Sequence, residues 1–169
     1  MIAYLLILAG FLFRLLPHAA NFSPVAAIAI FSGAYLSKKY VPWVPLAIMI
    51  LSDLVLGLHD VFLYTWGAFA ITGYMGMWLK GRKNIWSVTG VSLAASLFFF
   101  IVTNFGVWVA WYPHTVQGLA DCYLKAVPFL RNTVVSGLAY TMALFGAYEL
   151  AARVAVKTRF KDILLSTKY

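Results

Sequence analysis

The chain has 169 residues, of which 63% are hydrophobic and only 11% are charged, whereas soluble domains carry about 25% charged residues. This composition excludes a soluble globular protein and predicts one integral membrane domain over residues 1–169. The net charge of +8 comes from short basic clusters between apolar runs, a pattern that indicates membrane topology and contact with the lipid bilayer rather than nucleic-acid binding. The single cysteine excludes an internal disulfide.

Six apolar segments are predicted to form transmembrane helices. A helix needs about 20 apolar residues to span a bilayer, and these runs are continuously apolar, unlike the alternating strands of a membrane barrel. Small residues in Ala29-x-x-x-Gly33 and Gly73-x-x-Gly76 indicate close helix packing. We therefore expect an all-α bundle of six transmembrane helices over residues 2–17, 22–37, 42–58, 61–79, 86–109 and 126–152.

The distribution of basic residues predicts the orientation of this bundle. The connections on one side hold all three histidines but only one basic residue, Lys125. The turns after the second and fourth segments and the C-terminal tail, on the other side, hold ten: Lys38, Lys39, Lys80, Arg82, Lys83, Arg153, Lys157, Arg159, Lys161 and Lys168. Because basic loops stay in the cytoplasm, we expect both termini to be cytoplasmic and the histidines to face outward.

Two further segments lie outside the predicted helices. Residues 110–125 form the longest external connection and are rich in aromatic side chains, so we expect a lid at the outer membrane interface. Residues 153–169 form a basic cytoplasmic tail. From Lys157 onward this tail resembles a short surface helix, with an apolar side made by Phe160, Ile163 and Leu164.

A polar elbow joins the first two segments. Pro17 and Pro24 interrupt the helices there, because proline lacks the N–H that a helix interior needs. Polar groups at membrane depth usually face protein or a water-filled cavity. We therefore expect other polar groups to gather around this elbow, which contributes a charge, an imidazole, an amide and a hydroxyl: Arg14, His18, Asn21 and Ser23.

Five polar residues on four segments are predicted to lie in one layer, about 5–9 Å inside the outer boundary. They are Arg14, Asp53, Asn104, Arg131 and Asn132. With two arginines and one carboxylate the layer would be positive, which suits a ligand bearing a carboxylate or phosphate. The alternative is structural: Arg14 reaches the lipid headgroups and Asp53 pairs with Arg131.

The histidines and outer aromatic residues add candidates for the same pocket. Imidazoles bind metals, but the spacing of His18, His59 and His114 matches no metal motif, and we predict neither a metal nor a cofactor. Trp108 lies one turn after Asn104, on the face of the polar layer. We therefore add His18, Asn21, Trp108 and His114 to the five residues of the layer as candidate substrate-binding residues.

Common catalytic motifs are absent from the sequence. The sequence has no Walker motif, no HExxH and no GxSxG. We therefore expect that the protein is not an enzyme. A small membrane enzyme acting on a lipid-linked substrate, with Asp53 and His18 as acid and base, stays open as the weaker alternative. A non-catalytic subunit or anchor of a membrane complex is the other.

The pattern as a whole resembles the S component of energy-coupling-factor (ECF) vitamin transporters. It is also similar to an uncharacterised family of bacterial inner-membrane proteins with a suggested S-component-like transport role. The resemblance rests on RLLPHAANFSP at 14–24, SDL at 52–54 and TNFG at 103–106. It implies localisation in the bacterial inner membrane and uptake of a vitamin or vitamin-like molecule from the outer face.

The resemblance also implies partners and a ligand class. S components work with a coupling subunit and two ATPases and dock through an AxxxA-like pattern on the first helix. Here the first segment has Ala9-Gly10 but no AxxxA, so a solitary transporter or one with its own partner stays open. The arginines favour an anionic ligand and the aromatic residues a ring system. A corrinoid such as cobalamin ranks slightly ahead of other vitamins, because an imidazole can ligate cobalt.

Overall fold

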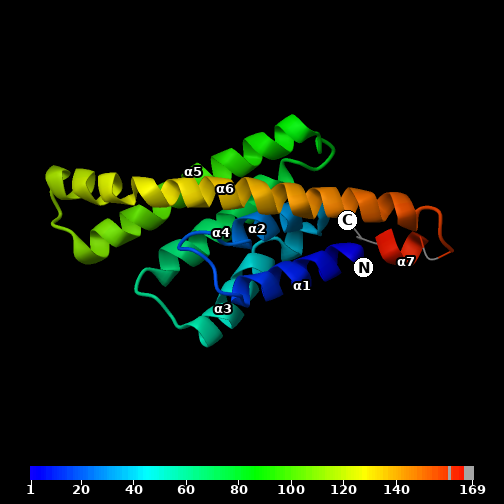
Figure 1. Ribbon diagram of the computed structural model, residues 1–169, viewed down its shortest axis with the longest axis horizontal. Helices are drawn as coiled ribbons and strands as arrows, with labels where there is room; N and C mark the ends of the chain where they lie inside the picture. Colours follow the sequence, from blue (N-terminus) through cyan, green and yellow to red (C-terminus); the bar gives the residue numbers. More distant parts are fainter. Residues whose placement is uncertain (160, 166–169) are drawn as a thin grey trace.

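The computed structural model describes residues 1–159 and 161–165, and this part of the chain is helical and contains no strand (Figure 1). The all-α prediction is therefore confirmed. The helices are α1 (Ile2–Leu15), α2 (Val25–Tyr35), the 3-10 turn η1 (Lys38–Tyr40), α3 (Trp43–Leu56), α4 (Phe62–Met77), α5 (Ile85–Trp111), α6 (Val116–Ala155) and α7 (Lys161–Leu165).

The predicted lid at residues 110–125 is wrong as a separate connection. Helix α5 runs on to Trp111, residues 112–115 make a short turn, and α6 begins at Val116. Thr115 explains this early start, because its side chain accepts a hydrogen bond of 3.0 Å from the backbone N–H of Gly118 and caps the helix. The first turns of α6 thus occupy the sequence that we expected to be a loop.

The predicted tail begins later than expected. Residues 153–155 belong to the last turn of α6, and among the described residues after it α7 is a helix of five residues. Phe160 and Lys168, which the prediction included, lie outside the described residues.

Three helical segments of the described chain are long and apolar enough to cross a membrane. They are Lys38–Leu56, Ile85–Trp111 and Val116–Ala155. Helices α1 and α2 are apolar but shorter, with 14 and 11 residues, and α4 has 16. Large apolar side chains are exposed on the outside of these helices, among them Leu54 at 79% and Leu63 at 69%. Such a surface is expected where lipid covers it.

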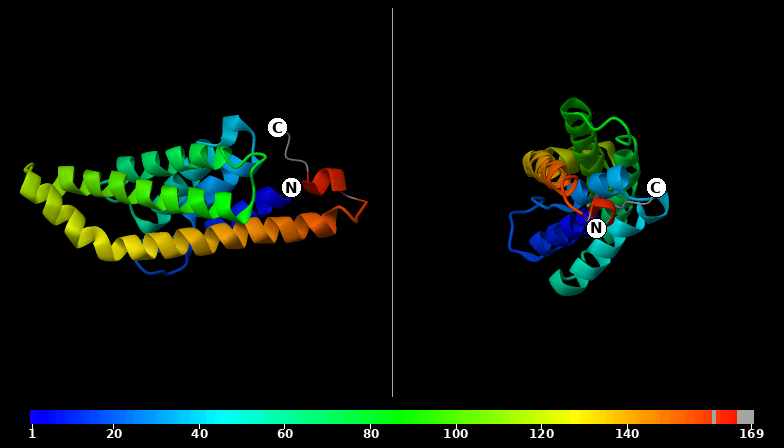
Figure 2. Two further views of the ribbon diagram at one scale, coloured as in Figure 1. Left: turned by 90° about the horizontal axis from the view of Figure 1, so that it is seen from above. Right: turned by 90° about the vertical axis from the view of Figure 1, so that its right-hand side faces the viewer.

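The chain runs back and forth between two ends of one bundle (Figures 1 and 2). At one end the N-terminal amine of Met1 donates to the carbonyl of Leu164 at 3.1 Å, and the hydroxyl of Tyr35 donates to Glu149 at 3.1 Å. We call this the terminal end. The opposite end holds residues 16–24, 57–61 and the turn 112–115, where the α5–α6 hairpin extends beyond the other helices, and we call it the hairpin end.

Helix α2 forms the centre of the bundle, and all eleven of its residues are buried. It crosses α4 at glycines: a Cβ on Gly33 would overlap the carbonyl oxygen of Gly73, and one on Gly76 would overlap the carbonyl oxygen of Ile30. The close packing predicted for these glycines is confirmed. Next to them Phe31 packs edge to face on Phe145, with ring centroids 5.5 Å apart.

Pro128 lies inside α6, and the helix bends in this region (Figure 2, left, yellow). Proline lacks the N–H that would bond to the carbonyl of Leu124, and its ring crowds that carbonyl, so a kink follows. The first part of α6 therefore leans at an angle to the remainder of the helix.

Candidate functional site

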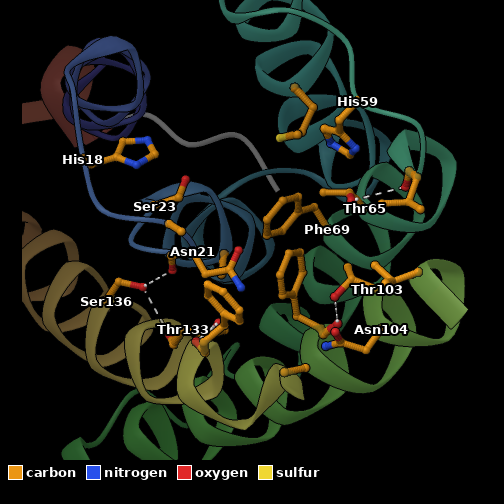
Figure 3. A pocket seen from close by; sticks show the side chains of 18 of the residues that line it. His18, Asn21, Ser23, His59, Thr65, Phe69, Thr103, Asn104, Thr133 and Ser136 are labelled. Atoms are coloured by element: carbon orange, nitrogen blue, oxygen red, sulfur yellow. Dashed lines mark hydrogen bonds between the residues drawn. The ribbon is translucent and has the colours of Figure 1, made fainter. Parts of the chain in front are cut away.

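A cavity of about 480 Å³ lies at the hairpin end (Figure 3). Each of the helices α1 to α6 contributes to its wall, and residues 18–23 add the elbow predicted from the sequence. Four of the nine predicted site residues line it: Arg14, His18, Asn21 and Asn104.

The elbow is fixed to α6 by two hydrogen bonds. The hydroxyl of Ser136 donates to the carbonyl of Asn21 at 3.2 Å, and the side-chain amide of Asn132 donates to the carbonyl of Ala20 at 3.1 Å. Asn21 has a φ of 58°, a left-handed conformation that asparagine tolerates better than most residues. Asn132 does not line the cavity, so it positions the elbow instead of facing the site.

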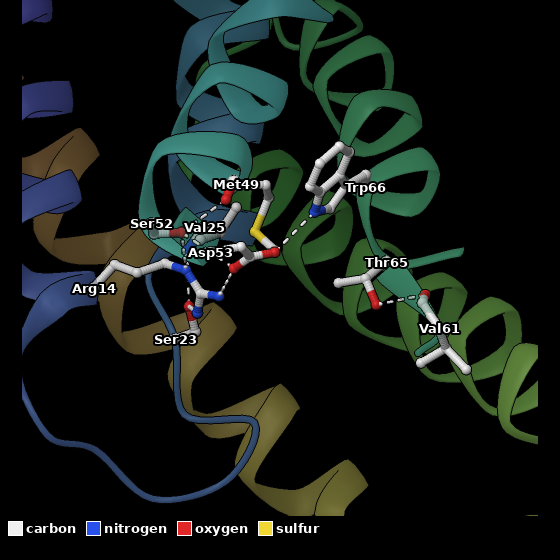
Figure 4. A network of polar contacts seen from close by, with 9 residues as sticks. All are labelled: Arg14, Ser23, Val25, Met49, Ser52, Asp53, Val61, Thr65 and Trp66. Carbon is white, nitrogen blue, oxygen red and sulfur yellow. Dashed lines mark hydrogen bonds and ion pairs between the residues drawn. The ribbon is translucent and has the colours of Figure 1, made fainter. Parts of the chain in front are cut away.

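Arg14 forms an ion pair with the buried Asp53 beside the cavity (Figure 4). The guanidinium Nη2 lies 3.3 Å from one Asp53 oxygen, Nε donates to Ser52 at 3.0 Å, and Nη1 donates to Ser23 at 3.1 Å. The indole Nε1 of Trp66 donates to the second Asp53 oxygen at 2.9 Å. This network joins α1, the elbow, α3 and α4, and it satisfies both charged groups.

The predicted positive arginine layer is therefore wrong. The partner of Asp53 is Arg14, not Arg131, and Arg14 points into the bundle instead of reaching toward headgroups. Arg131 is exposed and does not line the cavity. The reason is helical phase: Arg131 and Thr133 are close in sequence, yet only Thr133 is buried and faces the cavity.

Trp108 and His114 lie outside the cavity wall. The indole of Trp108 donates to the carbonyl of Pro113 at 3.0 Å, and Nε2 of His114 donates to the carbonyl of Val109 at 3.1 Å. The two rings lie 5.3 Å apart. Both residues therefore stabilise the turn between α5 and α6, because Trp108 of α5 is bonded to the turn and His114 of the turn is bonded to α5.

Asn104 lines the cavity from α5. Its side-chain amide donates to the carbonyl of Phe100 at 2.7 Å, one turn earlier on the same helix. This bond holds the side chain along α5 and leaves its oxygen as the group that can accept from a ligand. The thiol of Cys122 on α6 contacts the backbone carbonyl of Asn104 at 3.4 Å.

Sequence reasoning missed several residues of the wall. Phe69 and Phe99 stack with ring centroids 4.6 Å apart and an interplanar angle of 25°, and hydroxyls of α4, α5 and α6 lie around them (Figure 3). Nothing distinguished these two phenylalanines from others in apolar segments. Lys125 also lines the cavity. As the single basic residue of the predicted outer connections it did carry a signal, but we interpreted it only as part of the charge asymmetry.

The comparisons with known proteins assign a family. Residues 1–160 match the model of DUF6580, a family of unknown function, and the chain therefore belongs to that family. The chain matches no curated protein and no solved structure.

Proposed function

We propose that this member of DUF6580 is a substrate-binding membrane transport protein that takes up a vitamin or vitamin-like small molecule. The cavity at the hairpin end is the observation that carries the proposal. Its volume of about 480 Å³ falls within the range of about 300–1,000 Å³ typical of sites for small molecules. Its wall combines stacked aromatic rings with a few polar groups, the composition expected of such a site.

The proposed orientation places the hairpin end outside a bacterial inner membrane, with six helices crossing it. Two arguments support this. The N-terminus lies beside α7 at one end, where the amine of Met1 donates to the carbonyl of Leu164. Lys80 lies at that end too, since its ammonium donates to the carbonyl of Leu36 at 2.8 Å. Basic clusters favour the cytoplasmic side, so the cavity would open to the outside and collect ligand there.

The cavity volume also bears on the ligand. A space of about 480 Å³ suits a molecule of one or two fused rings, and a corrinoid would have to extend far beyond the wall. The stacked pair Phe69–Phe99 offers a flat apolar surface for such a ring. Among vitamin-like ligands we therefore rank small ring-containing molecules ahead of cobalamin.

The exposed face of α1 supports a solitary transporter or a partner other than the standard ECF coupling subunit. The small residues Ala3 and Gly10 are buried, and a Cβ on Gly10 would lie 2.8 Å from the side chain of Ile28. The outward face carries bulky residues such as Tyr4 and Leu8, which are 50% and 52% exposed. Docking through small residues of the first helix needs the opposite arrangement.

Mass spectrometry of small molecules released from the gently purified protein tests the proposal. Ala126 lines the cavity, whereas Ala139 lies on the exposed side of the same helix. We expect a vitamin-sized compound in the wild type and in Ala139→Phe, and at least a tenfold depletion in Ala126→Phe, whose ring fills the site. An empty wild type from cells grown with a full vitamin supplement would overturn the proposal and favour a subunit or anchor.

A further inference from the structure

The charges around the cavity are unequal in their contacts. Arg14 is committed to Asp53, Ser52 and Ser23 through all three guanidinium nitrogens. A ligand anion would have to replace these bonds, and the displaced Asp53 carboxylate would then lie buried without its counter-charge. Arg14 is therefore poorly suited to recognise an anion in the cavity.

Lys125 is the second cation of the wall, and its surroundings differ. Its ammonium lies 5.5 Å from the centroid of the Tyr112 ring, a contact with an aromatic face and not with a carboxylate. Asp121, one turn earlier on α6, accepts a hydrogen bond of 2.9 Å from Gln117. Within the described residues Arg14–Asp53 is the salt bridge of the structure, so Lys125 lines the cavity without a carboxylate in contact.

Acidic side chains are missing from the described part of the cavity wall. Besides Arg14 and Lys125, the titratable nitrogen groups that line it are the imidazoles of His18 and His59. A neutral imidazole can donate one hydrogen bond to an anion, and a protonated one can donate two. Because the charge of Arg14 is balanced by Asp53, the unbalanced charge of the wall is that of Lys125.

We propose that Lys125 recognises a carboxylate or phosphate of the ligand, so that the protein takes a small ring-containing acid. This inference rests on the proposed function and defines its ligand class. The ring would lie against Phe69 and Phe99, and the acidic group would point toward Lys125 on α6. A flexible lysine serves this purpose as a movable point charge. The same charge could instead hold the phosphate of an anionic phospholipid from the surrounding bilayer.

The test compares three variants of the purified full-length protein in mild detergent. Lys125→Gln removes the charge, Lys125→Arg retains it, and Arg131→Gln removes a charge from an exposed position outside the cavity. Small molecules and lipids are extracted from each variant and quantified by mass spectrometry. Lys125 is exposed, so the variants should fold, and size-exclusion chromatography with a melting curve verifies this.

We expect a water-soluble compound with a carboxylate or phosphate in the wild type. It should fall by about tenfold in Lys125→Gln, because a charge-assisted hydrogen bond is lost, and should persist in Lys125→Arg and Arg131→Gln. A neutral compound, equal retention in Lys125→Gln, or the loss of an anionic phospholipid in place of a soluble acid would overturn this inference alone. A wild type with no more compound than Ala126→Phe would overturn the proposed function instead.

Discussion

The two ends of the bundle solve opposite packing problems with the same helices. At the terminal end the glycines of α2 and α4 bring two backbones into contact, and the ring of Tyr35 lies on that of Tyr148 with centroids 4.0 Å apart and an interplanar angle of 42°. At the hairpin end the kink at Pro128 and the elbow leave a cavity of about 480 Å³. Small residues therefore determine where the helices pack closely, while a proline kink and a hydrogen-bonded loop determine where a cavity remains.

The largest loss of stability is expected from adding a side chain at the glycine contact of the terminal end. A Cβ at Gly33 would overlap backbone atoms of α4, which cannot rotate away as a side chain can. We expect Gly33→Ala to cost more than about 3 kcal/mol in unfolding free energy, because the two helices must separate. Gly90 of α5 has open space at the Cβ position, so Gly90→Ala should stabilise by up to about 1 kcal/mol through helix propensity.

Thermal melting of the two variants in detergent checks this prediction. The difference between them isolates helix contact from propensity, because both replace a helical glycine by alanine. Equal melting temperatures would mean that the close approach of α2 and α4 does not limit stability at the terminal end.

Breaking the ion pair at the hairpin end is expected to have the next largest effect. Asp53→Asn leaves the guanidinium of Arg14 without its counter-charge, and the side chain of Asp53 is only 3% exposed. We expect a loss of about 3 kcal/mol in stability. Asp60 lies at the same end but is exposed, so Asp60→Asn should change the stability by less than about 0.5 kcal/mol.

Denaturant titration with retained ligand as a second readout distinguishes two roles for this pair. Loss of both stability and ligand is expected if the pair supports the wall. Normal stability with loss of ligand alone would show instead that Asp53 contacts the ligand. The ion pair would then serve ligand binding at the hairpin end and not the stability of that end.

Straightening α6 at Pro128 is expected to change the stability by a smaller amount. Pro128→Ala restores an N–H to the helix and should raise stability by about 1 kcal/mol, less than the full proline cost of about 3 kcal/mol because the bundle is built around the bend. Retention of the cavity compound should fall at the same time, since Phe129 and Thr133 follow the kink and line the wall. The exposed neighbour Val127 provides the control in Val127→Ala. Greater stability with unchanged retention of the cavity compound would show that the kink does not create the cavity.

Much of the fold could be predicted because hydrophobic runs and prolines act locally. Each of the six segments corresponds to one helix, although α5 and α6 extend beyond the predicted bounds, and the glycine pairs pack as expected. The lid was wrong because Thr115 caps α6 and starts it ten residues early, and a polar, aromatic sequence can be either a loop or the end of a long helix. Hydropathy alone does not distinguish the two.

The site could be predicted only in part because it depends on which side of each helix faces inward. The elbow and Asn104 do line the cavity, since polar residues in apolar segments turn away from lipid. Arg131 shows the limit: depth along the helix was read from the sequence, but its phase was not. Phe69 and Phe99 show a second limit, because an aromatic residue in the wall of a cavity has the same sequence signal as one in a core.

The smallest effect is expected at Asn21, where the backbone at the hairpin end adopts a φ of 58°. Alanine is less tolerant of this region than asparagine, so Asn21→Ala should cost about 0.5–1 kcal/mol, whereas Asn21→Gly should be nearly neutral for the backbone. Both variants remove the same amide from the cavity. We therefore expect the two variants to differ in melting temperature, because their backbone strain differs. We expect them to retain the same amount of ligand, because both lack the amide. Equal stability of the two variants would show that Ser136, which donates to the carbonyl of Asn21, holds the elbow regardless of the residue placed there.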